Sequence, residues 1–255
     1  MKAFLTQFNG LPFPLVVSPK ASQKIARMDD LRGATVGVSS AGSQTHLVLN
    51  YILSRHGMTP ESVATTGIGF GGTNVAAIEH GRVDAAVTSS IGLETLRRRH
   101  RDLTVLFDPL DPARFREIFG TDNYPSYTLC ARTQWLEKNP ELARKVARAV
   151  VRGLRHLHDR PVSETVAKLP PEYQSAEPSV DIAVIERWRH KYSRDGRFPE
   201  SGYDAVMRVT AHSVEKVRLA NIDARTIDTN EFLENPVLKE TAPNEFTNPA
   251  EGAKP

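Results

Sequence analysis

Hydroxyl-bearing residues and a glycine gather in one short stretch, where they could hold a negatively charged group without a metal ion. The stretch runs from Val36 to Leu47, and its candidate ligand-binding residues are Ser39, Ser40, Gly42, Ser43 and Thr45. Their hydroxyls can donate and accept hydrogen bonds, and the glycine lets the backbone come close to a ligand. Because a helical pattern follows at once, free N–H groups and the helix dipole would favour an anion here. This chemistry binds a group and breaks no bond, and a simple helix cap is the structural alternative.

Two further turns follow apolar runs in the same way. The first holds Gly71, Gly72 and Thr73, with Thr73 as the N-cap of a short helix that ends at Gly81, and the second holds Thr88 and Ser89. The carboxyl ends of parallel strands meet at one edge of a sheet, and ligands of such sheets gather there. We therefore predict that the three turns share one ligand site, with plain strand-end punctuation as an equal alternative for the last turn.

The motifs of common enzymes and of dinucleotide-binding proteins do not fit the chain. Gly67, Gly69 and Gly72 match the G-x-G-x-x-G spacing, but the helix that follows is short and no acidic residue is well placed for a ribose. A Gly-x-Ser-x-Gly elbow, an H-E-x-x-H motif and a C-x-x-C motif are absent from the sequence. His156 and His158 would point apart on a helix. We predict no catalytic residue, no metal and no cofactor.

The composition predicts a globular protein with no preference for nucleic acid. With 255 residues, 40% of them hydrophobic, the chain can bury a substantial core and is long enough for two lobes. Lys plus Arg number 33 against 30 Asp plus Glu, and a net charge of +3 gives no reason to expect a nucleic-acid partner. The basic run Arg97–Arg101 closes a predicted helix, where a solvated helix end is expected. Cys130, the single cysteine, lies in an apolar run that predicts a buried thiol.

No targeting or membrane segment is evident in the sequence as written. No apolar run approaches the ~20 residues that cross a bilayer. Met1–Gly10 is too polar and too short for a secretory signal. The chain is therefore expected to carry no export address of its own.

Strand and helix patterns alternate through the first half of the chain. We predict strands over residues 3–6, 14–18, 35–38, 63–66, 83–88 and 103–107, and helices over about 44–56, 74–80 and 92–99. This order favours a mostly parallel sheet covered by helices. After one more strand at 127–131 the pattern is helical, over about 140–157, 180–192 and 203–219. The first of these helices has a predicted buried stripe of Leu142, Val146, Val150 and Leu157, and a tail without periodicity begins near residue 241.

Three stretches of the chain resemble a known family. Asp30–Val38, the Ser-Gly-Ser turn with its Thr and His, and Ala76–Val87 together resemble the solute-binding proteins of ABC importers, of the nitrate/sulfonate/taurine type. The similarity runs from about residue 14 to 153, with a weaker echo at Thr229–Leu233. It implies an α/β, two-lobed fold of the periplasmic binding protein type II kind, with parallel-sheet lobes joined by a two-strand hinge.

The resemblance also places the lobes along the chain. Residues 1–30 and 124–240 would form lobe one, residues 31–123 lobe two, and residues 241–255 a tail. Leu15–Ser18 would be the first hinge strand and Ser126–Ala131 the returning strand. In that family an export signal and the first units of lobe one precede the stretch that begins here with Met1. Lobe one is therefore expected to be incomplete at its N-terminus.

By the same resemblance the chain is expected to be the substrate-binding component of an ABC importer and not an enzyme. It would capture a small anionic solute, similar to a sulfonate, nitrate or taurine, by lobe closure, and present it to a membrane permease from the periplasm or an equivalent extracytoplasmic space. Because the predicted cleft turns contain no Arg or Lys, a neutral pyrimidine, or an aromatic compound stacked on Tyr124 or Tyr127, stays open. Two other functions on the same scaffold also stay open. One is a small-metabolite enzyme of the thiamine-pyrimidine or menaquinone-pathway type, and the other is an intracellular ligand sensor.

Overall fold

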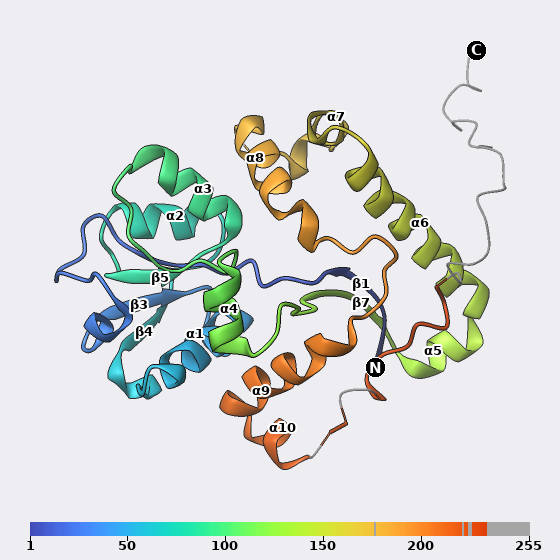
Figure 1. Ribbon diagram of the computed structural model, residues 1–255, viewed down its shortest axis with the longest axis horizontal. Helices are drawn as coiled ribbons and strands as arrows, with labels where there is room; N and C mark the ends of the chain where they lie inside the picture. Colours follow the sequence, from blue (N-terminus) through green and yellow to red (C-terminus); the bar gives the residue numbers. More distant parts are fainter. Residues whose placement is uncertain (176, 221, 224–225, 234–255) are drawn as a thin grey trace.

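Two groups of elements, each built on its own β-sheet, make up the protein. The computed structural model describes residues 1–175, 177–220, 222–223 and 226–233. Figure 1 shows a first group around the larger sheet and a second, mostly helical group, joined by extended segments. The tail predicted from residue 241 lies outside the described residues. Within the described residues, no helix is both long enough and apolar enough to cross a membrane.

The larger sheet is mixed. Its strands are β2 (Leu15–Val17), β3 (Thr35–Val38), β4 (Ala64–Gly67), β5 (Ala85–Val87) and β6 (Val105–Phe107), in the order β4-β3-β5-β2-β6. β3 runs parallel to β4 and β5, whereas β2 runs antiparallel to β5 and β6. The predicted mostly parallel sheet is therefore correct only in part.

The segment predicted as the first hinge strand is an interior strand of this sheet. β2 consists of three buried apolar residues, and such a continuous run suits a strand that is covered on both faces. Val16 packs with the α2 and α3 side, in one cluster with Val75 of α2 (Gly72–Glu79) and Leu93 of α3 (Ser90–Arg99). Leu15 and Val17 point to the other face, as strand alternation requires. The hinge at Leu15–Ser18 stays a prediction, and in the structure β2 lies between β5 and β6.

Four helices cover the larger sheet, and most begin at side-chain caps. They are α2 and α3, together with α1 (Gln44–Arg55) and α4 (Pro112–Phe119). Ser43 caps α1 by accepting from His46 N, and Ser89 caps α3 by accepting from Gly92 N. The N-cap of α2 is Gly71, with a φ of +66°, and not Thr73 as predicted. Thr73 lies one residue into the helix, where its hydroxyl donates to Phe70 O.

The second group contains a two-stranded antiparallel sheet, not the parallel sheet that was predicted. β1 (Lys2–Phe8) pairs with β7 (Tyr127–Ala131). Its helices are α5 (Thr133–Lys138), α6 (Pro140–Asp159), α7 (Val162–Ala167) and α8 (Pro178–Trp188), and two more helices follow in the chain, α9 (Tyr203–Ser213) and α10 (Glu215–Leu219). Short 3-10 helices occur at Met28–Leu31, Pro60–Ser62, Pro171–Tyr173, Arg189–Lys191 and Glu200–Gly202. Cys130 is exposed, so the predicted buried thiol is wrong, because β7 is a strand of this small sheet and not of a core sheet.

The predicted buried stripe of α6 is correct toward the C-terminal end, where Leu157 is buried and Val150 is partly buried, and wrong at the start of the helix. Ala143, Ala147 and Val151 are buried in a cluster with Leu5 of β1. Leu142 is 49% exposed and Val146 is also exposed. Small alanines allow the helix to approach the strand closely, whereas the prediction assumed that the larger apolar residues would face the core.

Several stretches of the described chain cross between the two groups, and the last returns to β1, where Thr229 N donates to Ala3 O. Residues 9–14 and 120–126 run side by side, with Asn9 O accepting from Tyr124 N and Phe8 O accepting from Ser126 N. The third crossing leads to α9, which packs on α1 of the first group. Val209 of α9 shares the core cluster of that group. The predicted assignment of all residues from 124 to 240 to lobe one therefore fails for α9.

Candidate ligand-binding cleft

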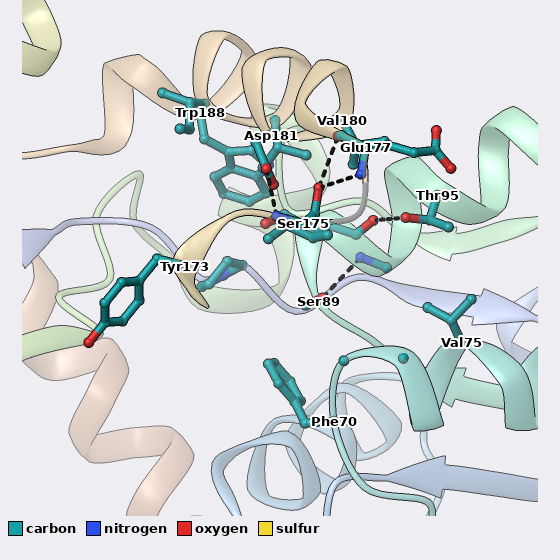
Figure 2. Close-up of a pocket in the computed structure, with 18 of the residues that line it drawn as sticks. Phe70, Val75, Ser89, Thr95, Tyr173, Ser175, Glu177, Val180, Asp181 and Trp188 are labelled. Carbon is teal, nitrogen blue, oxygen red and sulfur yellow. Dashed lines mark hydrogen bonds between the residues drawn. The ribbon is translucent and has the colours of Figure 1, made fainter. Parts of the chain in front are cut away.

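A cleft of about 800 Å³ lies between the two groups of elements. One wall consists of the starts of α2 and α3, with Gly71, Gly72 and Ser89. The opposite wall is α8 and the loop before it, including Ser175. Figure 2 shows these two walls facing each other across the open space. A concave site of this size is typical of small-molecule binding.

In the described part of the chain, six aromatic side chains line the cleft. They are Phe8, Phe70, Tyr127, Tyr173, Trp188 and Tyr192. Phe8 is the centre of the group, with ring centroids 5.6 Å from Tyr127, 5.6 Å from Trp188 and 4.9 Å from Tyr192. Phe70 is 50% exposed and Tyr173 is 73% exposed, so both offer ring faces to a ligand. Flat aromatic surfaces of this kind favour a planar ring as the bound group.

The hydroxyls of Tyr127 and Tyr192 are neutral hydrogen-bonding groups. Burial raises the pKa of the Tyr127 phenol above its ordinary value. Burial also raises the pKa of Tyr192, and the nearby Tyr127 adds to that shift. Both phenols therefore keep their protons at neutral pH and can donate to a ligand.

Acidic side chains outnumber basic ones in the lining. Glu79, Glu177 and Asp181 carry carboxylates, and Arg99 carries the basic group. Arg99 is already engaged, with Nη1 at 3.0 Å from Glu79 Oε2. This balance does not favour the anionic solute that was expected from the sequence, because an anion would meet more carboxylate than guanidinium charge.

Asp181 is the most deeply buried of these acids. It is 5% exposed and lies in the first turn of α8. Its Oδ2 accepts from Ser175 N at 2.8 Å, and the Ser175 hydroxyl donates to Glu177 O. Figure 2 shows the carboxylate between Ser175 and Trp188. The hydrogen bond from Ser175 N thus holds this carboxylate in the wall of the cleft.

The predicted site residues divide into two sets. Gly71, Gly72 and Ser89 lie in the cleft wall. Ser39, Ser40, Gly42, Ser43, Thr45, Thr73 and Thr88 are not among its lining residues. Thr88 is fully buried, and its N–H donates to Pro14 O. A role in ligand binding remains a prediction for every residue of both sets.

The Ser39–Thr45 turn satisfies most of its own polar groups. Ser39 N donates to Thr45 Oγ1 at 2.9 Å, and Ser43 Oγ lies 2.8 Å from the same oxygen. Ser43 Oγ also donates to Ser40 O, and Gly42 N donates to His46 Nδ1. These bonds are those of a well-formed helix cap, the structural alternative considered above.

The turn nevertheless lies beside the loop that carries Phe70. Gly69 N donates to Ser39 O at 3.2 Å, one residue before Phe70. The ends of β3 and β4 thus meet at one edge of the sheet, as predicted for parallel neighbours.

Most of the aromatic lining could not be found by motif reasoning. Tyr127 was considered as a stacking residue and lies in the cleft, whereas Tyr124 is 2% exposed and packs in the core against Phe119. Val184 and Trp188 follow Val180 at helical spacing, which is the pattern of a core-facing stripe and gives no sign of a ligand. Within the described residues, no group of three His, Cys, Asp or Glu side chains could hold a metal ion.

The fold and its cleft define the class of protein. A solved protein from Bordetella bronchiseptica RB50 superposes with a TM-score of 0.80 at 28% identity, over 91% of this chain and 72% of that chain. The periplasmic aliphatic sulphonate binding protein SsuA from Escherichia coli superposes with a TM-score of 0.57 at 17% identity, over 98% and 75%. A putative periplasmic sulfonate-binding SsuA from Methylobacillus flagellatus KT gives 0.63 at 15%, over 90% and 67%. The protein has an α/β fold like that of type II periplasmic binding proteins.

The sequence comparison gives the family. Residues 5–164 match the model described as NMT1/THI5 like, and the chain belongs to this family. A similar curated protein is the riboflavin-binding protein RibY of Chloroflexus aurantiacus, 28% identical over 143 residues. That match includes 56% of this chain and 37% of RibY, so this chain spans well under half of the curated relative.

Proposed function

We propose that the protein is the ligand-binding component of an ABC importer and captures a small aromatic solute in its cleft. The observation that carries this proposal is the aromatic lining between the two groups of elements, above all the exposed rings of Phe70 and Tyr173. The name of its relative RibY supports an aromatic solute, since that protein is described as binding riboflavin. The SsuA proteins share the fold but are described as binding sulfonates, a class that the acidic lining does not favour.

Two lobes and a hinge follow from the arrangement of the elements. We assign β1, β7 and α5–α8 to one lobe, and the larger sheet with α1–α4 and α9 to the other. The crossing segments 9–14 and 120–126 then form the hinge, since they lie side by side and connect the two sheets. Closure of α8 toward α2 and α3 would bury a solute, and binding would shift the open–closed population toward the closed form.

The closed form would be the signal that a membrane permease recognises. In this proposal the protein works on the outer side of the cytoplasmic membrane, and the solute leaves the cleft unchanged. Binding without turnover separates this function from that of a small-metabolite enzyme on the same scaffold.

The first experiment fills the cleft with a side chain. Ala76 is exposed on α2 and lies in the cleft wall, so Ala76→Trp blocks the space without disturbing the core. Riboflavin is the probe, and calorimetry measures its affinity for the wild type and the variant. We expect one riboflavin per chain, no product, and a loss of affinity of at least about tenfold in Ala76→Trp, which is ~1.4 kcal/mol.

The matched control is Ala149→Trp on the exposed face of α6, far from the lining residues. It should bind riboflavin as the wild type does. Equal riboflavin affinity of Ala76→Trp and the wild type would show that the cleft is not the binding site. Conversion of riboflavin into a product would show that the protein is an enzyme and not a receptor.

A further inference from the structure

The charge of the solute can be inferred from the groups that face the cleft, an inference that rests on the proposed function. The Asp181 carboxylate is buried and lies in the lining. Among the described residues, the one hydrogen bond to it comes from Ser175 N, and no basic side chain forms a salt bridge with it. A buried carboxylate is costly unless a partner offsets its lost hydration.

Basic side chains near the cleft already have acidic or polar partners within the protein. Arg99 pairs with Glu79, and His100 Nε2 lies 3.2 Å from the same carboxylate. Arg98 Nε pairs with Glu94 at 3.1 Å, and its Nη1 donates to Ser179 Oγ at 2.8 Å. An entering anion would have to break these pairs, whereas a cation would meet Asp181 directly.

Aromatic rings lie beside the buried carboxylate. Trp188 follows Asp181 by seven residues, on the same face of α8, and both line the cleft. Figure 2 shows the Trp188 ring next to the Asp181 carboxylate, with Tyr173 on the same side of the space and Phe70 opposite. Electron-rich ring faces attract cations, most strongly those of Trp and Tyr.

The helix dipole explains part of this arrangement but not all of it. An acid in the first turn of a helix is stabilised by the dipole, and Asp181 has that position in α8. Glu177 precedes the same helix and its side chain is 54% exposed, so the dipole alone does not require a buried acid. The burial of Asp181 among aromatic rings is the feature that needs a ligand to account for it.

We propose that the cleft takes a positively charged aromatic solute, with Asp181 as its counter-ion and the exposed rings of Tyr173 and Phe70 as those against which it stacks. The solute class is a planar ring system with a quaternised ring nitrogen or an attached ammonium group. The ring supplies apolar contact with the aromatic lining, and the cation replaces the missing partner of the carboxylate.

The test uses three probes that share one ring system and differ in charge. They are 1-methylquinolinium, quinoline and quinoline-4-carboxylate, measured by calorimetry at pH 8 and constant ionic strength. For the wild type we expect the cation to bind at least about tenfold tighter than quinoline, which corresponds to ~1.4 kcal/mol, and the carboxylate to bind weakest. This comparison needs no variant, so it does not depend on how a substitution folds.

Asp181→Asn then removes the charge and keeps an oxygen that can accept from Ser175 N. It should lower the affinity for 1-methylquinolinium about tenfold and leave that for quinoline within about twofold. Glu186→Gln, at an exposed position of α8 outside the lining residues, is the matched control, and it should leave the preference for the cation in place. Thermal melting of each variant verifies that it is folded.

Four results would overturn the inference. One is tighter binding of the carboxylate than of the cation, and another is equal affinity of Asp181→Asn and the wild type for the cation. If quinoline binds as tightly as the cation and Ala76→Trp abolishes both, the inference fails while the proposed function stands. If no probe binds, the inference also fails, and the riboflavin titration decides separately whether the cleft holds an aromatic solute.

Discussion

At the scale of single residues, Asp84 shows that a motif shared with a family can be structural. It belongs to the stretch Ala76–Val87 on which the resemblance rests, yet it lies away from the cleft. Its carboxylate accepts from Ser22 N at 2.7 Å, from Ser22 Oγ at 2.6 Å and from Thr35 N at 2.8 Å. These bonds tie the segment after β2 to the starts of β3 and β5. Asp84 therefore stabilises the sheet and does not contact the solute.

Asp84 gives a prediction for stability against pH. Burial alone would raise its pKa, but the bonds from Ser22 and Thr35 hold the pKa below its ordinary value. A lowered pKa adds stability that is present above the ordinary Asp value of about 3.9 and lost as pH falls through the folded-state value. We expect Asp84→Asn to lower the free energy of unfolding by ~1–3 kcal/mol at pH 7 and by less below about pH 4.

Urea unfolding at pH 7 and at pH 3.5 measures this difference. Asp29→Asn, at an exposed position nearby, is the control and should change stability little. A cost of Asp84→Asn that stays the same at both pH values would show that charge is not the reason.

At the scale of elements, the periodicity of the sequence predicted the positions of the helices. It predicted less well which face of a helix is buried. The spacing predicted α6 and the burial of Leu157, but in the first half of the helix Ala143 and Ala147 are buried in place of the larger apolar residues. The difference arises because close approach of a helix to a strand selects small side chains, and this cannot be read from hydrophobicity alone.

Two substitutions on α6 test this phase. Ala143 is fully buried, so Ala143→Leu should overpack the contact with β1 and cost ~1–3 kcal/mol. Leu142→Ala, one residue earlier and exposed, should change the free energy of unfolding by less than ~0.5 kcal/mol. Urea denaturation of both variants measures the two values. The reverse order would place Leu142 in the core and restore the sequence prediction.

Much of the candidate site depends on contacts that the sequence does not reveal. The turns at Gly71 and Ser89 could be predicted, because glycine and serine after an apolar strand mark a helix start. In the sequence, Phe8 is more than 160 residues away from both Tyr173 and Trp188. Only the fold brings these three rings to one cleft. The direction of β2 could not be predicted either, since a short buried run has the same pattern in parallel and antiparallel sheets.

At the scale of the whole molecule, contacts between α3 and α8 link, beside the cleft, the two groups of elements that we propose as lobes. Arg98 Nη1 donates to Ser179 Oγ and Nη2 donates to Ser179 O, at 2.8 and 3.0 Å. The Asp108 carboxylate forms salt bridges with Arg97 of one lobe and with Arg187 of the other. The basic run that was expected to be a solvated helix end thus joins the lobes.

These contacts predict an effect on closure. Arg98→Ala removes an inter-lobe contact outside the cleft, so we expect riboflavin affinity to fall by about two- to fivefold, since such exposed pairs contribute below ~1 kcal/mol. Small-angle scattering of the free protein should show a larger radius of gyration. Arg114→Ala, whose partner Glu117 is on the same helix, is the control. If neither affinity nor radius changes in Arg98→Ala, these contacts do not govern closure.

A crystal structure with riboflavin tests the central claim most directly, because it locates the solute. The account predicts flat electron density in the cleft, in contact with the rings of Phe70, Tyr173 or Trp188 and bounded by the starts of α2 and α3. Density at the Ser39–Thr45 turn that touches none of these rings, or an unoccupied cleft in a complex that binds in solution, would contradict it.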